Sequence, residues 1–114
     1  MSGADAQSAF VENVSIEELK SGLADGSIVL VDVREPNEFA AGHIPGATLN
    51  ALQSFDPAKL PPPAQGRRIV LSCRSGKRSL AALELARRAG RQDVRAHFPG
   101  GFQDWAQRGE AVER

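Results

Sequence analysis

Two continuous runs of apolar residues dominate the hydrophobic pattern of this chain. Residues 28–33 read IVLVDV and residues 68–73 read RIVLSC, and both runs are short and rich in β-branched side chains. A continuous run, unlike an alternating one, predicts a strand that is covered on both of its faces. The segments ATLN at 47–50 and DVRAHF at 93–98 are weaker strand candidates.

Helical signals lie between these strands. Ser15 and Glu18 have the spacing of a capping box, which predicts a short helix that runs to about Leu23. Pro36 can open a second helix at its first position, and Gly42 can close that helix after one or two turns. The pattern therefore places one helix before the first strong strand and another directly after it.

The clearest helix is expected over residues 78–89, with Gly90 as its cap. Its apolar positions among the alanines are Leu80, Leu83 and Leu85. A turn and a last short helix are expected within GGFQDWAQRG, residues 100–109. Strands that alternate with helices pair in parallel through right-handed crossovers, so the expected fold class is α/β, a three-layer α/β/α domain.

The length of 114 residues limits these elements to one domain. Residues 1–9 are small and polar and are expected to form a loose tail, which leaves residues 10–114 as the domain. No apolar run is long enough to span a membrane, and the first residues have neither the basic nor the apolar region of a signal peptide. With only one cysteine, we expect a cytoplasmic protein whose thiol stays reduced.

The formal net charge of zero argues against nucleic acid as a partner. The charges are nevertheless divided unevenly, because residues 1–57 carry nine acids and two bases while residues 58–114 carry five acids and twelve bases. One interpretation is that the two halves pair with each other across the fold. The other is that the basic half surrounds an anion site with positive potential. The sequence leaves both open.

The candidate chemistry lies where the second apolar run ends, at Cys73. A strand, a tight loop and a helix in succession aim backbone N–H groups into one concavity, which binds anions and lowers the pKa of a thiol placed there. Gly76 can adopt the positive φ angle that such a loop needs. The expected anion-binding loop consists of Arg74, Ser75, Gly76, Lys77 and Arg78.

The alternative for Cys73 is a buried structural cysteine, since free cysteines are among the most buried residues. Three cationic side chains within the next five positions favour a reactive thiol instead. A metal site is not expected, because there is no second cysteine and His43 and His97 are isolated in the sequence. No metal or organic cofactor is required by this chemistry.

Three ordered motifs resemble the single-domain rhodanese family of sulfurtransferases. They are VLVDVREPNEFAAGHIPGATLN, IVLSCRSGKRS and FPGGFQDWAQRG, and the resemblance covers nearly the whole chain. It implies an α/β fold around a five-stranded, mainly parallel sheet. It also implies that Cys73 takes a sulfane sulfur from a small anionic donor such as thiosulfate, carries it as a persulfide, and passes it to cyanide, a thiol or a protein acceptor.

The resemblance implies roles for residues outside the loop as well. Asp32 and Arg34 would form a buried pair that supports the interior beside the catalytic loop, and His43 would belong to a structural turn. Glu35 and Glu38 are interpreted as solvated acids at a helix start. Phe102 and Trp105 are expected to pack against the core. His97 and Phe98 depart from the family's commoner residues before the paired glycines, which leaves their effect on the pocket open.

Phosphatases and arsenate reductases of the same fold are a second interpretation. The related phosphatases have an active-site loop one residue longer, because a phosphate is larger than a sulfur atom. Four residues separate Cys73 from Arg78 here, which favours sulfur transfer. A third interpretation is a persulfide-carrying protein or a non-catalytic interaction module, and the presence of the cysteine disfavours the non-catalytic module.

Overall fold

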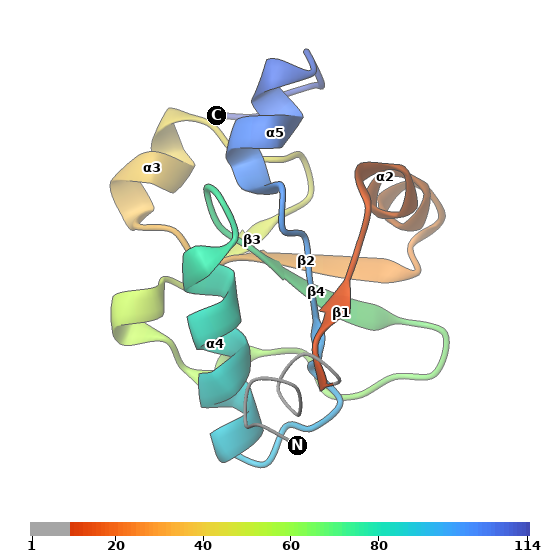
Figure 1. Ribbon diagram of the computed structural model, residues 1–114, viewed down its shortest axis with the longest axis vertical. Coiled ribbons are helices and arrows are strands. Elements are labelled where there is room, and N and C mark those ends of the chain that lie inside the picture. The colour runs from red at the N-terminus through yellow and green to blue at the C-terminus, as the bar shows by residue number, and fades with distance from the viewer. Residues whose placement is uncertain (1–9) are drawn as a thin grey trace, which may run out of the picture.

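The computed structural model describes residues 10–114, and its centre is a five-stranded sheet in which every pairing is parallel. The strand order is β1-β5-β4-β2-β3 (Figure 1). The strands are β1 (Glu12–Asn13), β2 (Ile28–Asp32), β3 (Thr48–Leu49), β4 (Arg68–Ser72) and β5 (Ala96–His97). The predicted α/β class is confirmed, and the sheet is entirely rather than mainly parallel. The tail expected at residues 1–9 lies outside the described residues.

The two strong strands agree with their apolar runs, and β3 lies within the predicted segment 47–50, whereas β5 and β1 depart from the expectation. β5 is limited to Ala96–His97, shorter than the segment 93–98 expected from sequence. β1 was not predicted, because Glu12 and Asn13 are polar and exposed. This strand exists because its residues pair with β5, at Glu12↔Ala96 and Asn13↔His97.

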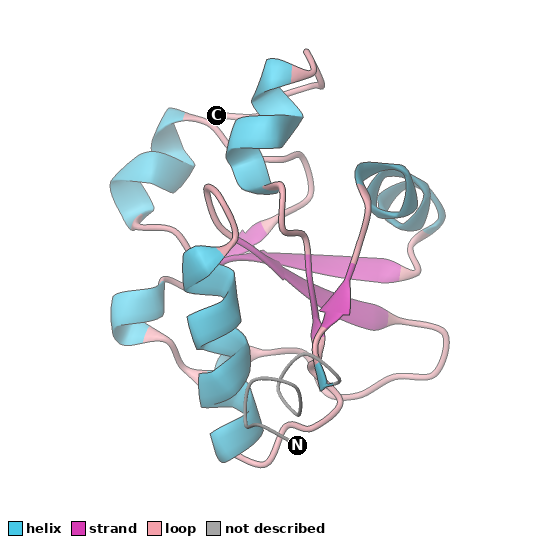
Figure 2. Ribbon diagram, viewed as in Figure 1, coloured by secondary structure: helices cyan, strands magenta, loops and turns pink. Residues whose placement is uncertain are grey.

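Four α-helices and two short 3-10 helices surround the sheet within residues 10–114 (Figure 2). The α-helices are α2 (Ile16–Asp25), α3 (Pro36–Ala41), α4 (Lys77–Arg88) and α5 (Gly101–Gln107), and the 3-10 helices are η1 (Leu52–Ser54) and η2 (Pro57–Lys59). The capping box is present, since Ser15 Oγ accepts from the N–H of Glu18 while Glu18 Oε1 accepts from the N–H of Ser15, both at 3.1 Å. α2 runs two residues beyond the expected end at Leu23.

The expected helix over residues 78–89 is α4, which begins one residue earlier and ends at Arg88. The three leucines of α4 do not share one environment. Leu83 is buried, but Leu80 and Leu85 are 45% and 40% exposed. Small residues make up the rest of the buried face, namely Ser79, Ala82 and Ala86. Small side chains allow α4 to lie close to the sheet, whereas Leu80 and Leu85 lie on its outer side.

Two apolar clusters lie on opposite faces of the sheet and confirm the layered arrangement. One joins residues of α2 and α5, including Leu19 and Trp105, to Leu30 and Val70 of the sheet. The other joins α4 to the opposite face. Figure 1 shows α4 on one side of the strands and α2 on the other. Continuous apolar runs are therefore what both central strands require.

The carboxyl ends of β2 and β4 lie side by side, because Asp32 pairs with Ser72 in the parallel register. The chain leaves β2 towards β3 on one side and returns as β4 on the other. In open α/β sheets such a reversal of strand order opens a crevice at the carboxyl ends, where ligands bind. Cys73 is the first residue beyond β4 at this edge.

Candidate active site

The loop between β4 and α4 curls around the sulfur of Cys73. Gly76 has a φ of +97°, in the left-handed region that favours glycine, and is the N-cap of α4. In this conformation the Gly76 N–H donates to Cys73 Sγ at an N···S distance of 3.1 Å. The predicted strand, tight loop and helix are thus present, with a loop amide aimed at the thiol.

Burial and hydrogen bonding act in opposite directions on the Cys73 thiol. Cys73 is 1% exposed, and burial raises the pKa of its thiol. The backbone and hydroxyl of Ser79 and the backbone amides of Ser75 and Gly76 lower it, and together they outweigh burial. The net effect is a pKa below the ordinary value, which increases the thiolate fraction near neutral pH.

The outer side of the loop is held by the first turn of α5. The N–H of Phe102 donates to the Cys73 carbonyl at 2.8 Å, and the N–H of Gln103 donates to the Arg74 carbonyl at 3.1 Å. Gly101 makes this contact sterically feasible, since a Cβ there would lie 2.4 Å from the Arg74 carbonyl oxygen. With the carbonyls bound on the outside, the loop amides face the sulfur. The sequence did not predict this contact, because it joins segments far apart in the chain.

Arg78 is engaged by an acid that sequence reasoning had interpreted as solvated. Its Nη1 and Nη2 donate to Glu38 Oε1 and Oε2 at 2.7 and 3.0 Å. The Arg78 guanidinium lowers the pKa of Glu38 to about 2, and Glu38 in turn raises the pKa of Arg78. Glu38 also accepts from the N–H of Glu35 at 3.0 Å. The interpretation of Glu38 as a solvated acid is therefore wrong, because the fold brings α3 beside the start of α4.

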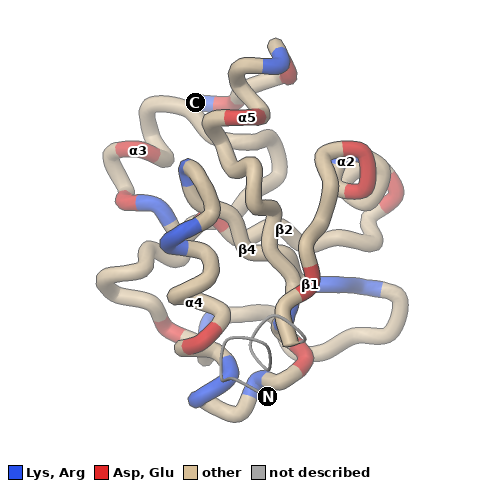
Figure 3. Tube along the Cα trace, viewed as in Figure 1, with Lys and Arg blue, Asp and Glu red and all other residues tan. Residues whose placement is uncertain are grey.

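The other polar residues of the loop face solvent. Arg74, Ser75 and Lys77 are exposed. Within residues 10–114, neither Arg74 nor Lys77 forms an ion pair. Figure 3 shows basic positions along the loop that leads into α4. Two cationic side chains are thus left unneutralised at the edge of the site.

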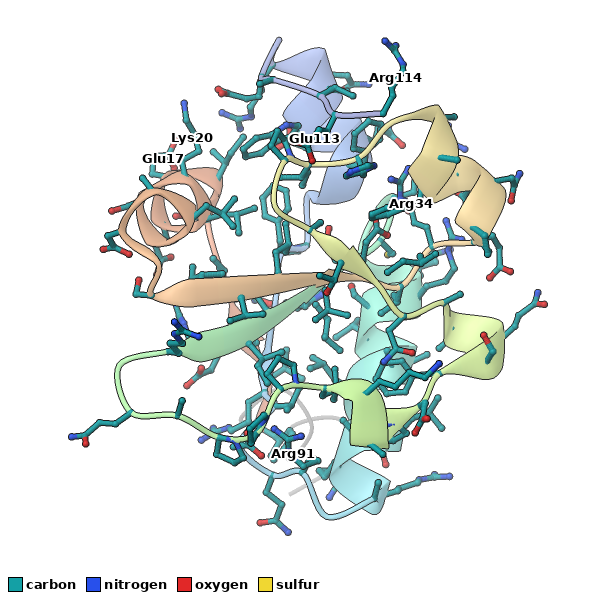
Figure 4. All side chains as sticks on the ribbon, turned by 180° about the vertical axis from the view of Figure 1, so that it is seen from behind. Glu17, Lys20, Arg34, Arg91, Glu113 and Arg114 are labelled. Atoms are coloured by element: carbon teal, nitrogen blue, oxygen red, sulfur yellow. The ribbon has the colours of Figure 1, made fainter. Side chains whose placement is uncertain are left out.

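Asp32 and Arg34 form a buried pair next to the loop, each 4% exposed. Arg34 Nη2 donates to Asp32 Oδ2 at 2.9 Å and to the Gly42 carbonyl at 2.7 Å. Its guanidinium carbon lies 4.3 Å from the centre of the Phe102 ring. Arg34 therefore joins the end of β2 to the end of α3 and to α5, and Figure 4 shows it between these segments. A buried charge needs such partners, as expected for a structural pair.

His43 lies in the turn after α3 and makes no hydrogen bond to the loop among the described residues. Its Nδ1 is 2.8 Å from the Phe39 carbonyl, and its ring stacks on the Phe39 ring at 3.8 Å. Its Nε2 is 3.3 Å from Glu113 Oε1, and its backbone forms an antiparallel bridge with Glu113 (Figure 4). These contacts agree with a structural turn.

Sequence reasoning missed the connection between Cys73 and His97. Ser79 Oγ lies 3.7 Å from Cys73 Sγ and 2.8 Å from His97 Nδ1. His97 is buried, and its Nε2 lies 3.1 Å from Asn13 Oδ1. Phe98, by contrast, is part of the apolar core with Trp105. Only the unusual histidine before the paired glycines hinted at this arrangement.

No group of three or more histidine, cysteine or acidic side chains within residues 10–114 is arranged to hold a metal ion. The helices of this part of the chain are also too short or too polar to cross a membrane.

The sequence profile of the rhodanese-like domain matches residues 15–108, and the chain therefore belongs to the rhodanese-like family. It is 32% identical over 124 residues to the thiosulfate:glutathione sulfurtransferase of Saccharomyces cerevisiae, covering 94% of this chain and 88% of the yeast protein. It is also 42% identical over 83 residues to the uncharacterized protein slr1261 of Synechocystis, covering 73% of this chain but only 45% of that protein.

Solved structures agree with this assignment. The human single-domain sulfurtransferase TSTD1 superposes with a TM-score of 0.70 at 34% sequence identity, over 83% of this chain and 95% of the human one. Together these similarities support a sulfurtransferase activity, which uses a sulfur donor and a sulfur acceptor.

Proposed function

We propose that this protein moves a sulfane sulfur from a donor such as thiosulfate to a thiol or cyanide, through a persulfide on Cys73. The observation that supports this most directly is the loop amide of Gly76 aimed at a thiol whose pKa is lowered. The same donors that stabilise the thiolate would stabilise the anionic persulfide. The yeast relative is named for thiosulfate and glutathione, which suggests this donor and a small thiol as acceptor.

In the first half-reaction the Cys73 thiolate attacks the outer sulfur of thiosulfate. The sulfur–sulfur bond of thiosulfate breaks, sulfite leaves with the electron pair, and Cys73 becomes a persulfide. Thiosulfate is a dianion, and the exposed cations Arg74 and Lys77 would attract it. Ser75 and Gly76 contribute backbone N–H groups to the cradle.

In the second half-reaction an acceptor thiolate or cyanide attacks the terminal sulfur and releases the Cys73 thiolate. The chain has one cysteine, so the acceptor is a separate molecule, either a small thiol, cyanide or a protein sulfur acceptor. A lone thiol nucleophile works only while it is reduced, and we therefore assign the reaction to the cytoplasm.

A phosphatase or arsenate reductase reaction is less well supported. Phosphoryl transfer needs an arginine free to bind the equatorial oxygens of a phosphate. Both terminal nitrogens of Arg78 donate to Glu38 instead. The short loop and this engaged arginine together favour a single sulfur atom over a phosphate as the bound group.

Mass spectrometry after incubation with thiosulfate tests the proposal. We expect a gain of one sulfur atom (about 32 Da), located on Cys73 and removed by cyanide or glutathione. Cys73→Ser is the matched control, because it keeps the size of the side chain and cannot form a persulfide. If no sulfane donor adds sulfur to the folded protein, the interaction-module interpretation replaces this one. Hydrolysis of an aryl phosphate that depends on Cys73 would instead favour the phosphatase.

A further inference from the structure

A chain of polar groups leads from the buried thiol to the exposed edge strand β1. It runs from Cys73 Sγ to Ser79 Oγ, then to His97 Nδ1, and from His97 Nε2 to Asn13 Oδ1, at 3.7, 2.8 and 3.1 Å. The four residues come from the active-site loop, α4, β5 and β1. Cys73 and Ser79 are 1% and 0% exposed, so the thiol faces this chain rather than bulk water.

The partners fix the tautomer of His97. Asn13 presents its carbonyl oxygen, which can only accept, so Nε2 carries the ring proton of the neutral imidazole. The Ser79 hydroxyl has two acceptors within reach, the Gly76 carbonyl at 3.1 Å and, at the shorter distance of 2.8 Å, His97 Nδ1, whose lone pair can accept from it. With its proton donated to His97, Ser79 Oγ can accept from the Cys73 S–H. Every donor in the chain therefore points away from Cys73, which is the direction in which a proton would leave.

The surroundings keep His97 neutral while Cys73 is protonated. Burial alone lowers the pKa of His97, and no charged group among residues 10–114 contributes to that shift. The polar side chains that face the ring are those of Ser79 from α4 and Asn13 from β1, and its partner on β4 is the apolar Leu71. Near the thiol, the guanidinium of Arg78 interacts electrostatically with Cys73.

We propose that His97, acting through the Ser79 hydroxyl, accepts the proton that leaves Cys73 before sulfur transfer. This inference rests on the proposed sulfurtransferase reaction, in which Cys73 must be a thiolate. The Cys73 S–H bond breaks and its proton moves to Ser79 Oγ, while the Ser79 hydroxyl proton moves to His97 Nδ1. The products are a thiolate and an imidazolium, and nothing is oxidised or reduced.

The product state is satisfied by the same groups. After transfer the imidazolium donates from Nδ1 to Ser79 Oγ and from Nε2 to Asn13 Oδ1. The proton that Ser79 Oγ received from Cys73 already points to the sulfur, so the hydroxyl donates to the thiolate, which also accepts from the Gly76 N–H at 3.1 Å. Two proton shifts along existing hydrogen bonds therefore separate the two states. The positive charge on His97 remains beneath the thiolate and stabilises it.

The pH dependence of thiolate formation distinguishes this role from a structural one. The ultraviolet absorbance of the thiolate and the rate of alkylation by iodoacetamide both report the Cys73 pKa without requiring sulfur transfer. His97→Asn keeps a polar side chain that can bond to Ser79 but cannot take up a proton. We expect its thiol pKa to rise by about one unit, which slows alkylation at neutral pH roughly tenfold.

Two further variants sharpen the result. His43→Asn is the matched control, because His43 is also buried but contacts Phe39 and Glu113 instead of the loop. The Cys73 thiol of this variant is expected to titrate like that of the wild type.

Asn13→Asp introduces a carboxylate next to His97 Nε2, which raises the pKa of His97. A stronger proton acceptor is expected to lower the pH at which the thiolate appears, opposite to His97→Asn.

If folded His97→Asn titrates like the wild type, the proposed role of His97 is overturned. Should that variant fail to fold, the wild type still decides the matter through the ¹⁵N chemical shifts of the His97 ring. We expect a proton on Nε2 at neutral pH, and a proton on Nδ1 instead would contradict the relay. The Cys73 thiols of the wild type and the variants could titrate as expected while no sulfane donor forms a persulfide. That result would overturn the proposed function and still support the proposed role of His97.

Discussion

At the scale of single residues, the backbone of Gly76 decides how the Cys73 sulfur is solvated. Its φ of +97° turns the N–H toward the sulfur, 3.1 Å away. The same residue lies against the loop before α5, where an added Cβ would be 2.8 Å from the Pro99 carbonyl oxygen. Both the angle and the space exclude a side chain here. A one-atom change at Gly76 is therefore expected to affect stability and reactivity together.

Gly76→Ala is expected to destabilise the fold and raise the pKa of the Cys73 thiol, because the strained loop no longer aims its amide at the sulfur. Gly90→Ala is the matched control, since Gly90 has a φ of +90° with nothing within 4 Å of an added Cβ. The control should lose about 1–2 kcal/mol for the left-handed conformation alone and keep the wild-type thiol titration. Chemical denaturation and alkylation rates measure the two effects. Equal losses of stability in both variants would contradict the clash at Pro99.

At the scale of elements, the ion pair between Glu38 and Arg78 connects α3 to the first turn of α4. Arg78, the last basic residue of the loop, is bound by Glu38 in this pair. The contact holds α3 against the first turn of the helix that follows Cys73. Both side chains are about one-third exposed, at 28% and 32%, so solvent weakens the pair without abolishing it. A structural role for Arg78 follows from this contact.

The depressed pKa of Glu38, about 2, makes this pair sensitive to acid. A carboxyl whose pKa falls on folding stabilises the protein above its unfolded pKa, and that stability is lost as the pH falls through the folded value. We therefore expect Glu38→Gln to cost about 1 kcal/mol at neutral pH, after allowance for solvent screening, with the difference from the wild type vanishing between about pH 4.5 and 2.

Denaturant unfolding across this pH range measures the effect. Glu84→Gln is the control, because the partners of Glu84 are Arg87 and Arg88 on its own helix, so its loss should leave the contact between α3 and α4 unchanged. A Glu38→Gln stability profile parallel to that of the wild type down to pH 2 would contradict the role of the ion pair.

At the scale of the whole molecule, the formal net charge is zero. The exposed side chains of Arg74 and Lys77 nevertheless form a basic edge at the candidate active site. The first interpretation of the uneven charge distribution, pairing between the two halves, applies in part. Arg78 pairs with Glu38, and Arg68 lies within 4 Å of Glu12 and Glu18, so the halves do neutralise each other across the fold. Arg74 and Lys77 have no such ion pairs among the described residues. Their field is free to act on an approaching anion.

Replacing both Arg74 and Lys77 by glutamine is expected to raise the KM for thiosulfate several-fold and to flatten its dependence on ionic strength, because salt screens exposed charges over about 10 Å at 0.1 M. The Arg87→Gln, Arg88→Gln double variant removes the same charge from the far end of α4 and should behave like the wild type. Initial rates in a salt series provide the measurement. If the KM for thiosulfate depends on ionic strength equally in both double variants, Arg74 and Lys77 do not contribute to capture of the donor.

The sequence by itself determined the central strands and the capped helices, and it marked Cys73 as the candidate reactive residue. Apolar runs, capping residues and the loop after Cys73 are local features, and local backbone preferences suffice to interpret them. The three motifs that resemble rhodaneses added the expected reaction. The sequence did not indicate which leucines of α4 are buried, since the spacing of apolar residues does not say which side of a helix lies closest to the sheet.

The tertiary structure alone decided which groups reach the thiol. Glu38 meets Arg78, the first turn of α5 binds the loop carbonyls, and His97 lies behind Ser79, although these residues are far apart in the chain. Even β1, which supplies Asn13, exists only because it pairs with β5. Contacts of this kind depend on strand order and helix packing, which no local pattern of residues encodes. The sequence singled out Cys73 as the candidate nucleophile, and the fold supplied the groups that lower its pKa.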